Sequence, residues 1–318
     1  MKFSNTVALA GVCWIFVGAA ACAQEYPARP LHIYTSQPGS GSDVVARVLA
    51  KRLPETFGQT AVVDNRGILA PEIAAKAAPD GYTVLFYSTP LWVSPLLQTK
   101  SQWDATRDFA PVTLAVNAPN LLAVHPSLPV KSVRELLALS KARPGELNYG
   151  SGSVGSSSHL AAELFNAMAG VNIVRVPYRG VGPATVGLLG GQVQVLFPSA
   201  GAGLPYVKSG RMRALAVAST KPSALLPDVP TIAAAGVPGY EADTPLGVFV
   251  PAGTPAKIVA QLYQGIAATL QLSDIRKLVL TQGFEVVASS PADFAAWMKS
   301  DVARWRTLIR DKGLKEGA

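Results

Sequence analysis

The stretch Ser36-Gln37-Pro38-Gly39-Ser40-Gly41-Ser42-Asp43 separates a short apolar run, 31–35, from an amphipathic run that begins at Asp43. The first run is typical of a β-strand, and the second places four aliphatic residues between positions 44 and 49 on one face of a helix. Glycines let the backbone turn tightly, while serine hydroxyls and the free N–H groups of a first helical turn donate hydrogen bonds to an oxyanion. The stretch therefore predicts a strand–loop–helix unit with a candidate anion site at the helix start.

A second loop of the same kind is Gly150-Ser151-Gly152-Ser153-Val154-Gly155-Ser156-Ser157-Ser158-His159, again between a predicted strand and a predicted helix. If the two loops belong to different lobes, they can face each other across a cleft and each hold one end of a short anion. The alternative is that both are turns with local serine caps. Asp43 fits a helix cap, which would organise the first loop without touching a ligand.

Short β-branched runs alternate with helical stretches beyond residue 26, which is typical of parallel strands covered by crossover helices. Proline-rich joints at 118–126 and 221–230 suggest a middle domain inserted into a discontinuous first one. We expect lobe 1 to comprise 24–121 plus 225–318, and lobe 2 to comprise 122–224. The predicted strands are 31–35, 61–64, 83–87, 120–125, 148–150, 172–176, 193–197, 214–218 and 247–250.

The N-terminus has the pattern of a cleaved secretory signal over 1–23, with Lys2, an apolar segment at 7–23, and small residues at Ala21 and Ala23. A lipoprotein anchor at Cys22 is the minor alternative, because no large aliphatic residue stands three places before it. Both cysteines of the chain lie in this segment, so the mature protein is expected to have neither disulfides nor cysteine-bound metals.

Composition narrows the class of protein further. The 318 residues are 49% hydrophobic and 15% charged, so the chain can bury a large core, most simply as two domains. The net charge is +8, and it becomes +7 without Lys2; this suits an anionic ligand but is equally an ordinary solubility charge. Because lysine and arginine do not cluster with aromatic residues, nucleic-acid binding is not expected.

Enzyme and cofactor interpretations find little support. Gly150, Gly152 and Gly155 match a dinucleotide-binding glycine pattern, but the acidic residue expected about 20 positions later is missing before Asp228. The three histidines lack metal-ligand spacing, and the serines beside His159 do not form a nucleophile-elbow motif. We therefore predict a binding protein that is not an enzyme and has no cofactor or metal.

An ordered set of short motifs resembles the Bug receptors, the extracytoplasmic binding proteins of tripartite tricarboxylate transporters, over nearly the whole mature chain. The motifs are Tyr26-Pro27-x-Arg29-Pro30, Pro38-Gly39-x-Gly41-Ser42-Asp43, Ala78-Pro79-Asp80-Gly81-Tyr82-Thr83, Asp108-Phe109-Ala110-Pro111-Val112, Leu147-Asn148-Tyr149, Val176-Pro177-Tyr178-Arg179-Gly180, Leu189-Gly190-Gly191-Gln192-Val193 and Pro227-Asp228-Val229-Pro230-Thr231.

This resemblance implies an α/β, type II periplasmic-binding-protein fold, with two hinged lobes and a ligand cleft between them. It also implies a periplasmic monomer that holds a small carboxylate through amides, hydroxyls and waters and delivers it to the permease subunits. The alternative is a periplasmic ligand sensor that presents its closed form to a signalling partner. The ligand-binding positions it implies are Ser36, Gly39, Ser40, Gly41, Ser42, Asp43, Ser88, Thr89, Ser153, Gly155, Ser156, Ser157 and Ser199.

Three departures from the family pattern border the expected pocket. The segment 65–71 is about four residues shorter than usual and lacks the family's glycine cluster, so one wall of the cleft is expected to be rebuilt. Ser36 and Gln37 replace an apolar pair with hydrogen-bonding groups, and 197–201 lacks a polar Asp-Asn pair. The resemblance therefore does not transfer the identity of the ligand.

Overall fold

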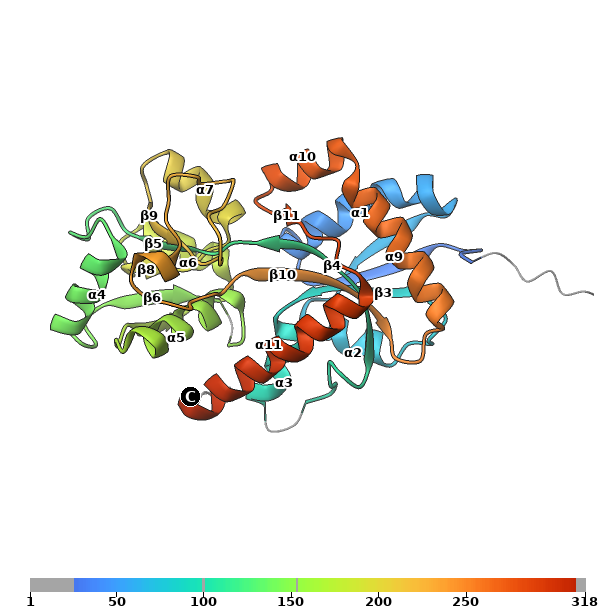
Figure 1. Ribbon diagram of the computed structural model, residues 1–318, viewed down its shortest axis with the longest axis horizontal. Helices are drawn as coiled ribbons and strands as arrows, with labels where there is room; N and C mark the ends of the chain where they lie inside the picture. Colours follow the sequence, from blue (N-terminus) through green and yellow to red (C-terminus); the bar gives the residue numbers. More distant parts are fainter. Residues whose placement is uncertain (1–25, 99–100, 153, 313–318) are drawn as a thin grey trace, which may run out of the picture.

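The computed structural model describes residues 26–98, 101–152 and 154–312. The predicted signal segment, the alternative anchor at Cys22 and the candidate Ser153 lie outside the described residues. The described chain forms two α/β lobes, each built on its own sheet (Figure 1). Within the described part of the chain, none of the helices combines the length and the apolar character that crossing a membrane requires.

The first lobe has a six-stranded sheet in the order β11-β4-β10-β3-β1-β2. Its strands are β1 (Leu31–Thr35), β2 (Ala61–Asn65), β3 (Thr83–Ser88), β4 (Phe109–Ala118), β10 (Thr244–Pro251) and β11 (Glu285–Val286). Its helices are α1 (Gly41–Phe57), a short 3-10 helix (Gly67–Leu69), α2 (Ala70–Ala75), α3 (Pro90–Leu97), α9 (Ala256–Gln271), α10 (Ser273–Thr281) and α11 (Pro291–Lys312).

The second lobe has a five-stranded sheet in the order β7-β6-β8-β5-β9. Its strands are β5 (Leu121–Val124), β6 (Asn148–Ser151), β7 (Val174–Pro177), β8 (Val195–Leu196) and β9 (Arg213–Val217). The helices that accompany them are α4 (Val133–Ala142), α5 (Ser157–Ala169), α6 (Val181–Leu189), α7 (Ala200–Lys208) and α8 (Ile232–Ala235).

Parallel pairing gathers the loops that follow the strands. In the first lobe β1 pairs in parallel with both β2 and β3, and in the second β6 pairs in parallel with both β7 and β8. The carboxyl ends of parallel neighbours meet at one edge of a sheet, where open α/β folds bind ligands. Each lobe therefore presents three strand-end loops together, and the two serine-glycine loops are among them.

Two strand connections link the lobes. β4 leads into β5 through Pro119 and Asn120, and the chain returns into β10 through Ala242 and Asp243. The crossings are tied together, because the Asn120 side-chain amide donates to the Ala242 carbonyl at 2.7 Å and accepts from Thr244 Oγ1 at 2.9 Å. These two connected crossings form the hinge between the lobes (Figure 1).

The return crossing lies later in the chain than the predicted boundary at 224/225. Thr231 forms a β-bridge with Val217 of β9, and Tyr240 donates from its hydroxyl to the Ala161 carbonyl of α5 at 2.7 Å. These contacts pack residues between 225 and 241 on the second lobe. The chain thus stays in contact with the second lobe after the proline-rich joint that suggested the boundary, while the division of the whole chain into domains stays a prediction.

The core of the first lobe includes an aromatic cluster that joins α3, β10 and α11. Trp92 packs edge-on against Trp297 with ring centroids 5.8 Å apart, and Phe249 contacts Phe294 at 5.1 Å. Large aromatic side chains bury much apolar area each, so this cluster fixes the long helix α11 against the sheet. In Figure 1, α11 runs obliquely across the molecule toward the second lobe.

Candidate functional site

A cleft of about 250 Å³ lies between the strand-end loops of the two lobes. The first lobe contributes Ser36, Gln37, Ser40, Gly67, Ile68, Tyr87, Ser88, Pro90, Ser94, Gln98 and Trp103. The second lobe contributes Gly152, Val154, Ser156, Arg179, Gly180 and Val181. Both predicted serine-glycine loops therefore border one cleft, as expected if they act together, although ligand contact by any residue stays a prediction.

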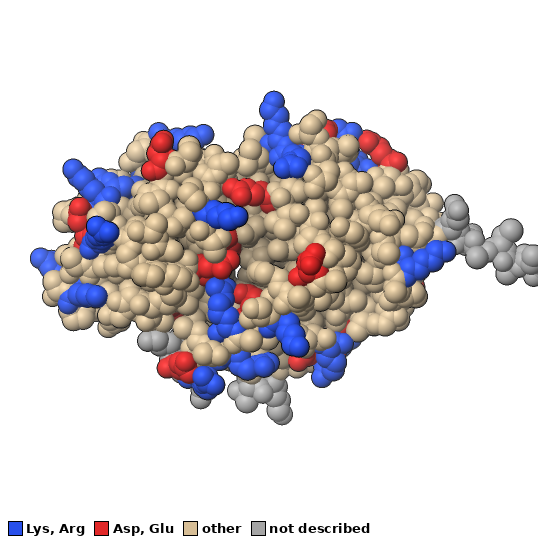
Figure 2. Space-filling model, in the orientation of Figure 1, with Lys and Arg blue, Asp and Glu red and all other residues tan. Residues whose placement is uncertain are grey.

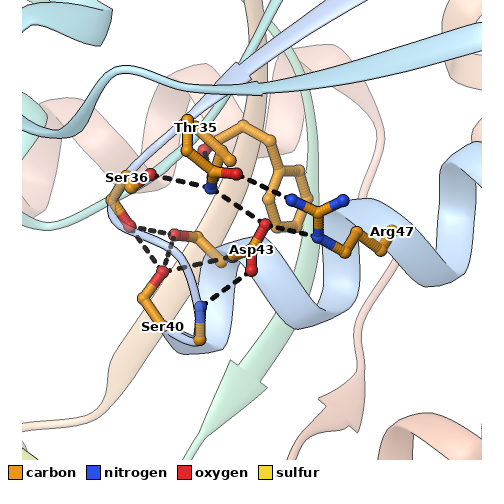
Figure 3. A network of polar contacts seen from close by, with 9 residues as sticks. Thr35, Ser36, Ser40, Asp43 and Arg47 are labelled. Atoms are coloured by element: carbon orange, nitrogen blue, oxygen red, sulfur yellow. Dashed lines mark hydrogen bonds and ion pairs between the residues drawn. The ribbon is translucent and has the colours of Figure 1, made fainter.

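Serine hydroxyls of the first loop form a small network at the start of α1 (Figure 3). Ser40 is the N-cap of the helix and accepts from the Asp43 backbone N–H at 3.3 Å. Its hydroxyl also lies 2.7 Å from that of Ser36, which makes a short contact with Ser42. Ser36 and Ser40 line the cleft, whereas Ser42 is 4% exposed and lies beneath them.

Asp43 supports the loop from below. Its Oδ2 accepts from the Gly39 backbone N–H at 2.8 Å, and its Oδ1 accepts from Arg47 Nε at 2.8 Å and from Asn65 Nδ2 at 2.9 Å. Burial acts to raise the pKa of this carboxyl, but the hydrogen bonds from Asn65 and Gly39 and the Arg47 guanidinium together outweigh it and hold the pKa below its usual value. Asp43 is not among the cleft-lining residues, and because Ser40 is the N-cap, Asp43 is not the helix cap that the sequence predicted; it organises the loop from the first turn of α1.

The two glycines of the first loop have different roles. Gly39 has a positive φ of 75°, a conformation that glycine adopts without strain, and it donates its N–H to Asp43. At Gly41 a Cβ atom would lie 2.5 Å from the Phe284 ring. Gly41 thus lets α1 pack closely on the segment before β11, and it does not line the cleft.

The second loop is held by buried partners behind it. Gly155 has a φ of 79° and donates its N–H to His159 Nδ1 at 3.2 Å. Ser156 is the N-cap of α5 and lines the cleft, whereas Ser157 begins the helix outside the lining. Arg175 donates to Ser151 Oγ at 2.8 Å and to the Gly152 carbonyl at 3.0 Å, which fixes the loop to the sheet.

His159 is a buried structural residue. It is 5% exposed, and burial, assisted by the positive charge of Arg175, lowers its pKa to about 4. The side chain is therefore neutral near pH 7, with Nδ1 acting as a hydrogen-bond acceptor for the Gly155 amide. This arrangement stabilises the second loop.

The three remaining predicted ligand-binding positions, Ser88, Thr89 and Ser199, lie in different parts of the structure. Ser88 lines the cleft at the end of β3. Thr89, the next residue, lies 3% exposed against a separate cavity near the hinge. Ser199 precedes α7 and forms a β-bridge with Asn120, away from the cleft lining. The structure therefore brings together Ser36, Ser40, Ser88 and Ser156 from the predicted set.

Several lining residues were not predicted as ligand contacts. Ile68 belongs to the shortened segment 65–71; it lines the cleft, and the residue is 65% exposed. Trp103 and Tyr87 also line it, and neither has a local sequence signal, because only the packing of the lobe brings them there. Arg179 gave a weak signal, since it lies in a span, 164–227, that has no acidic residue.

The lining is nearly neutral. Arg179 is its one charged side chain, and no ion pair involves it among the described residues. On the face drawn in Figure 2, lysine and arginine are spread over both lobes instead of forming one patch. No three His, Cys, Asp or Glu side chains within the described ranges are grouped so as to hold a metal ion.

Comparison with known proteins gives a consistent result. The family model described as tripartite tricarboxylate transporter family receptor matches residues 45–314. Protein BugT of Bordetella pertussis is 36% identical over 324 residues, which covers 99% of both chains. A UPF0065 protein from the tcbD-tcbE intergenic region of a Pseudomonas species is 36% identical over 310 residues, or 95% of this chain and 92% of the relative.

Solved structures agree in fold. The structure described as R. palustris Rpa4515 with adipate has a TM-score of 0.83 and 36% identity, and covers 92% of this chain and 99% of that one. MatC from Rhodopseudomonas palustris with bound malate has a TM-score of 0.79 and 28% identity, with coverage of 89% and 100%. The two-lobed binding-protein fold predicted from the sequence is confirmed.

Proposed function

The chain belongs to the tripartite tricarboxylate transporter receptor family, and on that premise we propose that its cleft captures a carboxylate with an apolar body. The protein is an extracytoplasmic solute-binding protein, and the open question is the chemistry of its ligand. The observation that carries the proposal is a lining with an apolar wall, several hydroxyls and one cation, Arg179, which forms no ion pair with another described residue.

The polar part of the lining suits a carboxylate. Arg179 supplies a planar guanidinium from the second lobe, and the hydroxyls of Ser36, Ser40 and Ser156 supply neutral donors at two helix starts. A carboxylate that bridges the lobes would be held by donors from both, so its binding favours closure of the hinge.

The remainder of the lining suits an apolar body. Trp103, Tyr87 and Ile68 line it from the first lobe, and Val154 and Val181 from the second. Two of these rings are fixed by hydrogen bonds, since the Trp103 indole donates to the Leu91 carbonyl at 2.8 Å and the Tyr87 hydroxyl to the Gly67 carbonyl at 3.0 Å. Preformed apolar walls with a few placed polar groups are typical of small-molecule sites.

The proposal extends to how the ligand is handled. The family and the neighbouring structures are binding proteins, and we propose that this chain binds without turnover. The one histidine near the cleft, His159, is buried and engaged in holding the loop. We further propose that the signal segment is cleaved, that the mature protein is a periplasmic monomer, and that the closed form delivers its ligand to permease subunits.

Isothermal titration tests the proposal with hexanoate, benzoate, adipate and citrate, each beside its uncharged amide where one exists. We expect hexanoate or benzoate to bind, their amides to bind at least 10-fold more weakly, and Arg179→Gln to lose most of this preference. Arg143→Gln, an exposed change at the C-cap of α4, is the matched control. Equal binding of acid and amide, or disappearance of ligand with time, would contradict the proposal.

A further inference from the structure

A second cavity, of about 50 Å³, lies at the hinge, and none of its lining residues also lines the cleft. Ser88 lines the cleft, and Thr89 beside it lines this hinge cavity. The other lining residues come from β4, from the return crossing into β10 and from α11. They are Leu114, Asn117, Glu241, Asp243, Pro245, Trp297, Asp301, Arg304 and Trp305.

Three buried oxygen atoms of the hinge cavity have no hydrogen-bond partner among the described residues. They are Thr89 Oγ1, Asn117 Oδ1 and Asp243 Oδ1. The other atoms of the same groups are engaged, since Asn117 Nδ2 donates to Asp243 Oδ2 at 2.7 Å. Buried polar atoms left unpaired destabilise a fold substantially, so three that line one small cavity point to a bound species that pairs with all of them.

The charges around the cavity do not balance. Asp301 accepts from Arg304 Nη2 at 2.6 Å and from the indoles of Trp92 and Trp305 at 2.8 and 3.0 Å. Arg304 is further committed to the Glu241 carbonyl at 2.7 Å. Asp243 forms no ion pair in the described part of the chain, whereas Asp301 is paired with Arg304. The lining thus holds three acidic residues, Glu241, Asp243 and Asp301, and one basic residue, Arg304.

We propose that the hinge cavity binds one monovalent alkali cation through Thr89 Oγ1, Asn117 Oδ1 and Asp243 Oδ1. All three are oxygen donors, which hard cations prefer, and one of them belongs to a carboxyl group that forms no ion pair among the described residues. A calcium or magnesium ion would need more ligands and more charge than three oxygens and one carboxylate provide. The cavity volume accommodates an ion together with about one water molecule.

Two of the three ligands lie on the strand connections between the lobes, and the third lies beside the cleft. Asn117 lies on β4, and Asp243 directly precedes β10. Thr89 directly follows Ser88, the last residue of β3, which lines the cleft. A cation there links both crossings to the floor of the ligand site. The site does not depend on which solute the cleft takes.

Thermal unfolding of the ligand-free protein tests the site in NaCl, KCl and choline chloride at the same ionic strength and pH. Because a species that binds only the folded state raises its stability, we expect the melting temperature to be higher by roughly 2–4 °C in at least one alkali salt than in choline chloride. Asp243→Asn removes the charge with little change in shape, and we expect it to abolish this difference.

Two further variants make the test specific. Asp228→Asn, an exposed change with no hydrogen bond among the described residues, should keep the full alkali-cation effect. Thr89→Val keeps the charge and the volume and loses one ligand, so it should reduce the effect even if Asp243→Asn does not fold. Equal melting temperatures of the unchanged protein in all three salts, or an undiminished effect in Thr89→Val and Asp243→Asn, would overturn the proposal.

Discussion

At the residue scale, Ser156 combines two roles in one hydroxyl. It caps α5 by accepting from the His159 backbone N–H at 3.4 Å, and it lines the cleft. Ser132 caps α4 in the same way, at 3.2 Å from the Glu135 N–H, but it lies outside the cleft lining. The pair therefore allows capping to be separated from ligand contact.

We expect Ser156→Ala and Ser132→Ala each to lower the free energy of unfolding by about 1 kcal/mol, the usual contribution of an N-cap. Only Ser156→Ala should also weaken binding of the carboxylate, by about 5-fold or more, since a ligand hydrogen bond is lost as well. Urea unfolding and calorimetric titration measure the two effects. Equal affinity in both variants would mean that Ser156 serves the helix alone.

His159 predicts how stability depends on pH. Its pKa is about 4 in the folded protein, against an ordinary value of 6.5, so between these values the unfolded chain binds a proton that the folded chain does not. The free energy of unfolding should therefore fall as the pH drops from 6.5 to 4, by up to roughly 3 kcal/mol, and stay level above 6.5 as far as this group is concerned.

Urea unfolding at a series of pH values checks this dependence. The asparagine in His159→Asn offers an acceptor near the position of Nδ1 but cannot be protonated. The part of the pH dependence of the unfolding free energy that comes from position 159 should therefore vanish in this variant. His125→Asn is the control, because among the described residues the His125 side chain bonds only to Ser127, and this variant should keep the slope of the unchanged protein. The same slope in His159→Asn would assign the dependence to other groups.

At the element scale, the start of α1 depends on the carboxylate beneath it. Asp43 is 4% exposed and accepts from a backbone amide, a guanidinium and a side-chain amide that belong to the loop, the helix and β2. One buried group thus sets the position of the helix start relative to the sheet, and with it the position of Ser36 and Ser40 in the cleft.

We expect Asp43→Asn to lower the free energy of unfolding by about 1–3 kcal/mol, because one acceptor becomes a donor facing other donors. Ligand affinity should fall about 10-fold, although Asp43 does not line the cleft. Asp293→Asn, in the exposed first turn of α11, should change neither by much. If stability fell and affinity stayed the same, the loop geometry would be irrelevant to binding.

At the scale of the whole molecule, the lobes also touch where α7 meets the turn between α10 and β11. At Gly201 of the second lobe a Cβ atom would lie 2.0 Å from the Gln282 carbonyl oxygen of the first. Gly283, on the same turn, has a φ of 84°, and a Cβ atom added there would lie 2.1 Å from the Gly201 backbone nitrogen. This contact involves backbone on both sides, so a methyl group there cannot be accommodated by a side-chain rotation.

We therefore expect Gly201→Ala to change the relative orientation of the lobes and to lower ligand affinity at least 10-fold. Gly203→Ala is the matched control, because its Cβ meets Leu121 and Pro198 within the second lobe and leaves the contact between lobes intact. Calorimetric titration beside thermal unfolding distinguishes the two. Similar affinities in both variants would show that this contact does not set the lobe orientation.

Much of the fold could be predicted from local patterns, and the exceptions have physical causes. The strand predicted at 31–35 is β1, and the helix start at Asp43 is confirmed within two residues. β4, the longest strand, was not predicted, because Pro111 interrupts its sequence pattern. It forms nevertheless, since β10 pairs along its whole length and accommodates two register shifts.

What the sequence by itself determined is the local chemistry: the strand–loop–helix units, the serine caps, and hence the two loops that border the cleft. Caps and turns depend on residues a few positions apart, so their signals survive in a linear chain. The tertiary structure alone decided which distant residues meet, including Arg179 opposite Ser36 and Asn117 beside Asp243, which are 126 positions apart. Such meetings follow from strand order and lobe packing, which local patterns do not encode.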